Sequence, residues 1–178
     1  MLSAAEFIRA QLKRLHTGLG KSLDDLTPQQ LHAVPGGHPK ANTIAWGLWH
    51  YARTEDNIVR WGIQERRPPI WTEAGYGERL GLPPVAQGTG MSTEDAHALR
   101  IKDLPLFEEY MQKVWAGTEE LLAGATPALF EKMVTVKPLG EMSVIQCLGQ
   151  VGLVHGMTHL GEIELARTLV GAGTVSGL

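Results

Sequence analysis

Four long stretches of this sequence repeat their apolar side chains with the period of an α-helix. The first stretch spaces them at i, i+4, i+7 and i+11, which aligns them on one face of a helix. No run alternates apolar and polar residues convincingly, so we expect no β-strand. Helices that bury their apolar faces against one another form a bundle, and the sequence therefore predicts an all-α, four-helix-bundle fold. The expected helices cover residues 3–20, 42–64, 103–123 and 143–170, and the first face consists of Ile8, Leu12, Leu15 and Leu19.

Capping sequences mark where some of the helices begin. Ser3 precedes Glu6 by three residues, which is the spacing of a capping box. Thr27-Pro28 supplies an N-cap and a proline at the first helical position, and Gln30 completes a second box. Thr126-Pro127 repeats the pattern. We therefore expect two short extra helices, one after each Thr-Pro pair.

Residues 65–92 interrupt the helical pattern. They contain two Pro-Pro pairs and several glycines, and they show neither a helical nor an alternating period. We expect a long loop after the second long helix. Such a loop is often a lid or a binding loop, and the ordinary alternative is a surface excursion.

Composition and charge limit the classes of function. A chain of 178 residues is expected to form one domain, 1–178, with a sizeable core. The formal net charge is −3 and there is no long basic run, which argues against nucleic acid or an anionic membrane as a partner. The only cysteine, Cys147, excludes an intrachain disulfide, and we expect it to be buried. Without a recognisable signal peptide or membrane span, a cytoplasmic protein is expected.

His155 and His159 lie one helical turn apart in an otherwise apolar seam of the fourth long helix. A buried imidazole without a partner loses its hydrogen bonds to water at a cost of a few kcal/mol. Three arrangements avoid this cost: hydrogen bonds to buried partners, a water-filled pocket, or a shared metal ion. Two histidines are rarely enough for a metal site, so a third ligand is needed from another part of the chain.

A faint internal repeat points to His50 as that ligand. Thr27-Pro28 recurs as Thr126-Pro127 about 100 residues later, and Thr43-Ile44 recurs as Ser143-Val144. The second and fourth long helices are then pseudo-equivalent. By this alignment His50 and His155 are offset by about 7 Å along the helix axis. Facing side chains can span this offset if the two helices are staggered.

Other residues near the histidines have more than one interpretation. Glu162 could be a fourth ligand, orient an imidazole N–H, or act as a general base on metal-bound water, or it could simply face solvent. Glu55 is rotated off the helix face that carries His50. We therefore expect it to have a structural role or to contact a metal ligand without binding the metal itself. Trp46 lies one turn before His50 and either fills the core or walls a pocket above the metal. The remaining histidines, His16, His32, His38 and His97, are expected to be ordinary surface residues.

At these residues the chain resembles the DinB-like superfamily, also described as DinB/YfiT-like metalloenzymes. The resemblance covers the architecture of the whole chain. It is specific at Leu-Trp-His-Tyr-Ala-Arg-Thr-Glu, residues 48–55, and at His-Gly-Met-Thr-His-Leu-Gly-Glu-Ile, residues 155–163. In that family one histidine from helix 2 and an HxxxH pair from helix 4 bind a divalent metal, usually zinc or nickel. The resemblance therefore implies His50, His155 and His159 as metal ligands.

The resemblance also implies a homodimer and a small-molecule substrate. Family members with known activity use a low-molecular-weight thiol, such as mycothiol or bacillithiol, as the cosubstrate of a transferase or isomerase. The prediction is a divalent-metal-binding protein that activates a thiol or water, either as a thiol-dependent S-transferase or isomerase or as a hydrolase. The alternative is a metal- or ligand-binding or dimerisation module without turnover.

Overall fold

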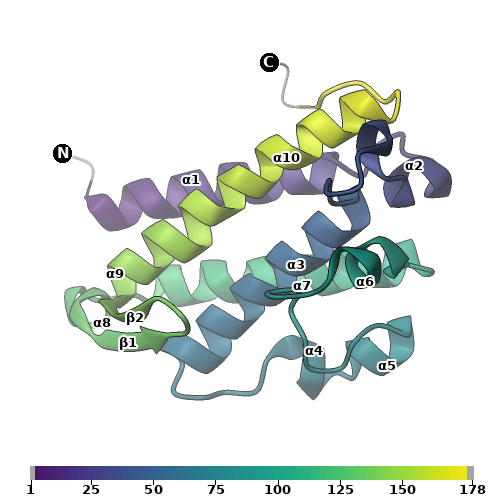
Figure 1. Cartoon of the computed structure of the whole chain (residues 1–178). Helices are drawn as coiled ribbons and strands as arrows, with labels where there is room; N and C mark the ends of the chain where they lie inside the picture. Colours follow the sequence, from purple (N-terminus) through teal and green to yellow (C-terminus); the bar gives the residue numbers. More distant parts are fainter. Residues whose placement is uncertain (1–2, 176–178) are drawn as a thin grey trace.

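The computed structural model describes residues 3–175, and the four expected long helical segments are present in it (Figure 1). The second and fourth segments each contain a π-helical stretch. The prediction of an all-α bundle is therefore confirmed, apart from one small hairpin. The segments are α1 (Ala4–Lys21), α3 (Ile44–Asp56) with η2 (Asn57–Ile63), α7 (Leu104–Ala123), and α9 (Val144–Cys147) with η3 (Leu148–Val154) and α10 (His155–Leu169).

The predicted caps explain where the helices begin. The Ser3 hydroxyl accepts from the Glu6 amide, and the Glu6 carboxylate accepts from the Ser3 amide, so the capping box is complete. Thr27 and Gln30 form the same box. The expected short helices follow the two Thr-Pro pairs as α2 (Pro28–His32) and α8 (Pro127–Glu131). Two further short elements are η1 (Pro35–Gly37) and α6 (Thr93–Ala98).

The expectation of no β-strand is wrong for one hairpin. Strands β1 (Met133–Val136) and β2 (Gly140–Ser143) pair antiparallel, with Val134 opposite Met142. Both of these side chains are buried and the residues flanking them are largely exposed. Each strand has only four residues, which is too short for an alternating pattern to stand out in the sequence.

The apolar faces meet in one hydrophobic core, to which all four long segments contribute. The predicted face of α1 is fully borne out, since its four apolar residues are buried. On α10, of the two histidines expected in an apolar seam, His159 is buried and His155 is half-buried. Ile163 and Ala166 are buried beside them, whereas Thr158 and Glu162 are exposed.

Close packing of α3 against α10 depends on small residues. A Cβ atom added at Gly156 would lie 2.3 Å from Leu15 Cδ2 and 2.5 Å from Tyr51 Cε2. At Gly47 it would lie 3.3 Å from Ile163 Cγ1. These two glycines let the backbones of the helices approach closely, which brings the histidines of α3 and α10 within reach of each other.

The excursion at residues 65–92 is more ordered than the sequence suggested. It contains α4 (Ile70–Glu73) and α5 (Tyr76–Leu80), which lie below α3 in Figure 1. The side chains of Trp71 and Tyr76 are fully buried. The prediction of a long loop is therefore only partly correct, because it missed two helices of four and five residues, which are too short to carry a detectable period.

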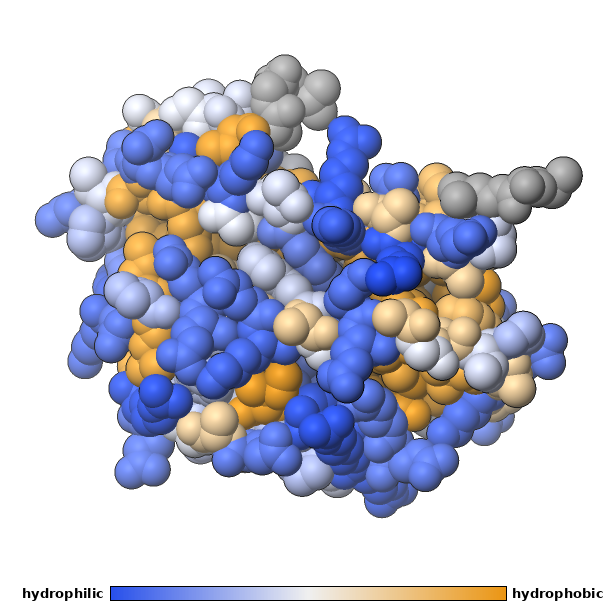
Figure 2. All heavy atoms as spheres, turned by 180° about the vertical axis from the view of Figure 1, so that it is seen from behind, coloured by the Kyte–Doolittle hydropathy of each residue, from blue (hydrophilic) through white to orange (hydrophobic). Residues whose placement is uncertain are grey.

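The face of the protein opposite to that of Figure 1 is mostly polar. Seen from behind, hydrophilic side chains cover most of the surface, with hydrophobic areas between them (Figure 2). Within residues 3–175, every helix is too short or too polar to cross a membrane.

Candidate metal centre

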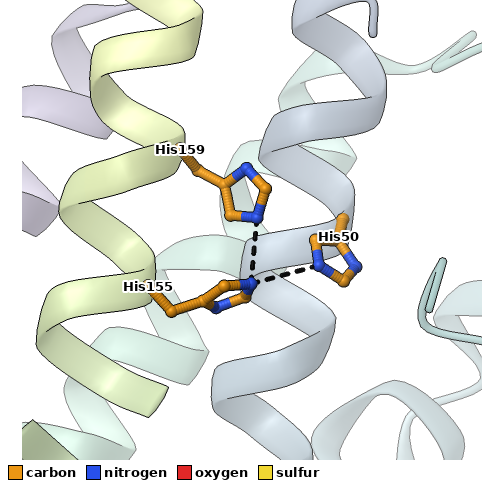
Figure 3. Close-up of side chains that lie close together, drawn as sticks. All are labelled: His50, His155 and His159. Atoms are coloured by element: carbon orange, nitrogen blue, oxygen red, sulfur yellow. Dashed lines mark hydrogen bonds between the residues drawn. The ribbon is translucent and has the colours of Figure 1, made fainter. Parts of the chain in front are cut away.

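The three predicted histidines come together between α3 and α10. In Figure 3 the ring of His50 projects from α3 toward the rings of His155 and His159 on α10. The Nε2 atom of His155 lies 3.3 Å from Nε2 of His50 and 3.0 Å from Nε2 of His159. One ring nitrogen from each residue falls in a group whose members lie within 4.8 Å of one another. The stagger inferred from the repeat therefore does bring these side chains into contact.

Two of the rings are oriented by acceptors on their far side. The Nδ1 atom of His50 donates to the backbone carbonyl of Gln87, and Nδ1 of His159 donates to the Glu162 carboxylate at 2.8 Å. A carbonyl and a carboxylate only accept, so each of these two rings carries its proton on Nδ1. The Nε2 lone pairs of His50 and His159 are thereby left free, and both face the third ring. The Nδ1 atom of His155 is buried and has no hydrogen-bond partner among the described residues.

This donor set fits a divalent metal ion. If His155 carries its proton on Nε2, this N–H can donate to only one of the two facing lone pairs. At least one lone pair therefore has no proton donor among the three rings. A cation at the centre would satisfy all three. Tetrahedral zinc binds imidazole nitrogen at 2.0–2.1 Å, which corresponds to nitrogen–nitrogen separations of about 3.3 Å. The two separations measured at His155, 3.3 and 3.0 Å, are close to this value.

Burial disfavours the doubly protonated, charged form of His50 and His155. Burial lowers the pKa of His50 to about 4, assisted by His159 and His155, although the Gln87 carbonyl opposes the shift. Burial, and then the neighbouring His159, also lower the pKa of His155. Neutral imidazole is the form that binds a metal, so protons would compete weakly with a metal at these two residues.

Comparison with known proteins agrees with the fold. The sequence model of the DinB superfamily matches residues 11–163, which is most of the chain. The chain belongs to the DinB superfamily. One solved structure, described as the conserved protein of locus from Enterococcus faecalis, shares this DinB fold with a TM-score of 0.80. Its sequence identity is 17%, and the match covers 96% of this chain and 99% of that one. The search of curated proteins found no match.

Trp46 forms one wall of the histidine cluster in this DinB-superfamily protein. Its ring stacks on His50 with a centroid separation of 4.7 Å, and it meets the ring of His159 edge-on at 6.1 Å. Only 8% of Trp46 is exposed. Trp46 therefore belongs to the core and lies against the histidine cluster, and a role as the wall of a pocket above a metal stays a prediction.

The two glutamates have different surroundings. Glu162 contacts His159 through Nδ1, the nitrogen on the far side of the ring from the cluster, so it orients that imidazole. Glu55 is buried and accepts hydrogen bonds from Thr118 and His16, on the side of α3 that faces α1 and α7. Burial raises the pKa of Glu55, but His16 and Thr118 hold it below its ordinary value. Its role in the described structure is therefore structural.

The expectation that four histidines lie on the surface is wrong for His16. This side chain is 12% exposed, and its ring stacks on Trp115 with centroids 5.1 Å apart. The buried carboxylate of Glu55 provides the physical reason, since it needs a partner. His16 lies one turn after Leu12 on the buried face of α1, and this spacing was the missed signal. His32 and His97 are partly buried, and His38 is exposed.

Other residues that shape the centre were missed because they lie in the excursion. Gln87 acts through its backbone carbonyl, which no side-chain pattern can indicate. Gly88 has a φ of +96°, and a Cβ atom there would lie 2.9 Å from Nδ1 of His50. The glycines of the sequence Gln-Gly-Thr-Gly at residues 87–90 were the available signal for a close backbone approach.

Proposed function

We propose that this protein binds one divalent metal ion through the Nε2 atoms of His50, His155 and His159 and uses it to activate a low-molecular-weight thiol or a water molecule. The observation that carries the proposal is the convergence of the three Nε2 atoms, with the tautomers of two rings set by Gln87 and Glu162.

The chemistry follows from the number and type of ligands. Three imidazoles leave coordination positions open, and a divalent ion held there lowers the pKa of a thiol or water bound to it. The protein orients the rings through Gln87 and Glu162, and Trp46 excludes water from one side. This set suits a thiol-dependent S-transferase or isomerase, or a hydrolase. Imidazole accepts several transition metals, and we propose zinc or nickel.

One observation favours a second candidate, a metal- or ligand-binding module without turnover. In residues 3–175, no carboxylate joins the three ring nitrogens in a possible ligand group. Glu162 is already engaged with His159 on the far side of its ring. A general base beside the metal would therefore have to come from the substrate or from a rearrangement of the site.

Metal content of the purified protein tests the proposal. We expect about one divalent ion per chain in the wild type, and Co²⁺ titration should give a saturable site. His50→Gln and His159→Gln should abolish this stoichiometric binding. His38→Gln is the matched control, since His38 is exposed and contacts none of the three histidines. Unchanged binding in the first two variants would contradict the proposal.

A panel of thiols separates the two candidates. Turnover in conjugation, isomerisation or hydrolysis assays that disappears with His50→Gln supports the enzyme. Full metal occupancy without turnover on any substrate in the panel supports the binding module. A homodimer stays a prediction, and light scattering of the purified protein tests it directly.

A further inference from the structure

We propose that residues 85–88 act as a strap that fixes Nε2 of His50 as its metal-binding atom, and that Arg53 and Asn57 are the positioning residues that hold this strap. The inference rests on the proposed function, because it assigns a role at the same metal site. The excursion at residues 65–92 then serves to position His50 and not to cover the site as a lid.

The strap is bound to one face of the second long helix by polar side chains. Arg53 donates from Nη2 to the Val85 carbonyl at 3.0 Å and from Nε to the Ala86 carbonyl at 3.4 Å. Asn57 donates from Nδ2 to the side-chain oxygen of Gln87. Arg53 and Asn57 follow His50 by three and seven residues, so the three side chains share a helix face. The backbone carbonyl of Gln87 accepts a hydrogen bond from Nδ1 of His50.

The side chain of Arg53 is buried and closely surrounded. Its side chain is 1% exposed, its guanidinium lies 4.9 Å from the ring centroid of Trp71, and it is 3.7 Å from the Asp56 carboxylate. A buried guanidinium is costly unless its donors are paired, so it favours the position of the strap that provides two carbonyls. Asp56 in turn accepts from the amides of Ile70 and Trp71, which anchors the start of the excursion on the same helix.

Gly88 shows that the strap is fitted to the metal site. Its φ of +96° is a conformation that other residues rarely adopt. An added Cβ would lie 2.9 Å from Nδ1 of His50, 3.1 Å from Trp49 and 3.2 Å from Trp46. The backbone of the strap is therefore packed directly on the ring of His50 and on the tryptophan that stacks with it.

The consequence concerns the tautomer of His50. A neutral imidazole carries its proton on either nitrogen, and only the lone pair of the unprotonated one can bind a metal. The Gln87 carbonyl holds the proton on Nδ1 and leaves Nε2 free. If the strap moves away, His50 gains the other tautomer and other ring orientations. The metal then has to select one of several states, which weakens its apparent affinity.

The test compares two buried arginines that both anchor the excursion. Arg53→Met releases the strap at Val85 and Ala86, whereas Arg60→Met releases Pro68 and Glu73 at the other end of the excursion. Long-range ¹H–¹⁵N spectra of the metal-free proteins at pH 7.5 report the tautomer of each histidine. We expect His50 to be Nδ1-protonated in the wild type and in Arg60→Met, and to become a mixture in Arg53→Met.

Co²⁺ affinity provides the second measurement. Loss of a group that orients a ligand typically weakens metal binding 10- to 100-fold, and we expect a loss of about this size in Arg53→Met but not in Arg60→Met. His159 is an internal control, since Glu162 sets its tautomer independently of the strap. A purely structural role of Arg53 would lower stability without changing the tautomer of His50.

Asn57→Leu is the second variant if Arg53→Met does not fold. It removes the bond to the Gln87 side chain and should shift His50 in the same direction. An unchanged His50 tautomer in the folded variants, with unchanged Co²⁺ affinity, would overturn the inference. Failure of the wild type to bind Co²⁺ would instead overturn the proposed metal function, so the two failures are distinguishable.

Discussion

Replacing Gly156 with alanine should destabilise the protein, although alanine is the better helix former. The glycine lies in α10 next to His155, where a Cβ atom would be 2.3 Å from Leu15 and 2.5 Å from Tyr51. Both neighbours are at most 1% exposed, so neither can move into solvent. The change from glycine to alanine contributes about 1 kcal/mol in helix propensity. Overpacking of this kind costs up to about 3 kcal/mol, which leaves a net loss of about 2 kcal/mol.

Urea unfolding of the metal-free protein measures this loss. A loss of about 2 kcal/mol corresponds to a decrease in Tm of roughly 4–8 °C for a chain of this size. Gly161→Ala is the matched control in the same helix, because a Cβ added there would point into open space, with no side chain of the described residues within 4 Å. We expect Gly161→Ala to be as stable as the wild type, or more stable by up to about 1 kcal/mol.

The metal site gives a second measurement on the same pair of variants. If the added methyl group separates α10 from α3, His50 moves away from His155 and Co²⁺ binding weakens in Gly156→Ala alone. A Gly156→Ala protein as stable as Gly161→Ala would refute the argument that close packing at this glycine holds the two helices together.

Three further predictions follow from the surroundings of individual side chains. Between pH 6.5 and about 4 the metal-free protein should lose about 3 kcal/mol of stability, because unfolded His50 takes up a proton near its ordinary pKa of 6.5 and folded His50 only near 4. This part of the pH dependence should vanish in His50→Gln when urea unfolding is repeated across the range. Glu162→Ala removes the acceptor from Nδ1 of His159 and should weaken Co²⁺ binding about 10- to 100-fold in a titration, and equal affinity would contradict the orienting role. Burial raises the pKa of the Cys147 thiol to about 11, so a disulfide reagent at pH 8 should modify it only after unfolding, and rapid modification of the folded protein would contradict its burial.

The sequence by itself determined the fold class and the identity of the three histidines that meet. Helical period and caps are local properties, because each depends on residues three or four apart. The four long helical segments therefore followed from spacing alone, and the faint repeat pointed to His50 as the partner of His155. The β1–β2 hairpin and the helices α4 and α5 did not follow, because four or five residues are too few to show a period.

Only the tertiary structure decided what surrounds those histidines. The partner of His50 is a backbone carbonyl of Gln87, and the partner of Glu55 is His16, which lies 39 residues earlier in the chain. Backbone groups are the same in every residue, so the sequence carries no mark of which carbonyl will face a ring. Pairings between distant residues depend on how α3 packs against α1, α10 and the excursion. The ring orientations that would make these histidines a metal site therefore arise from packing.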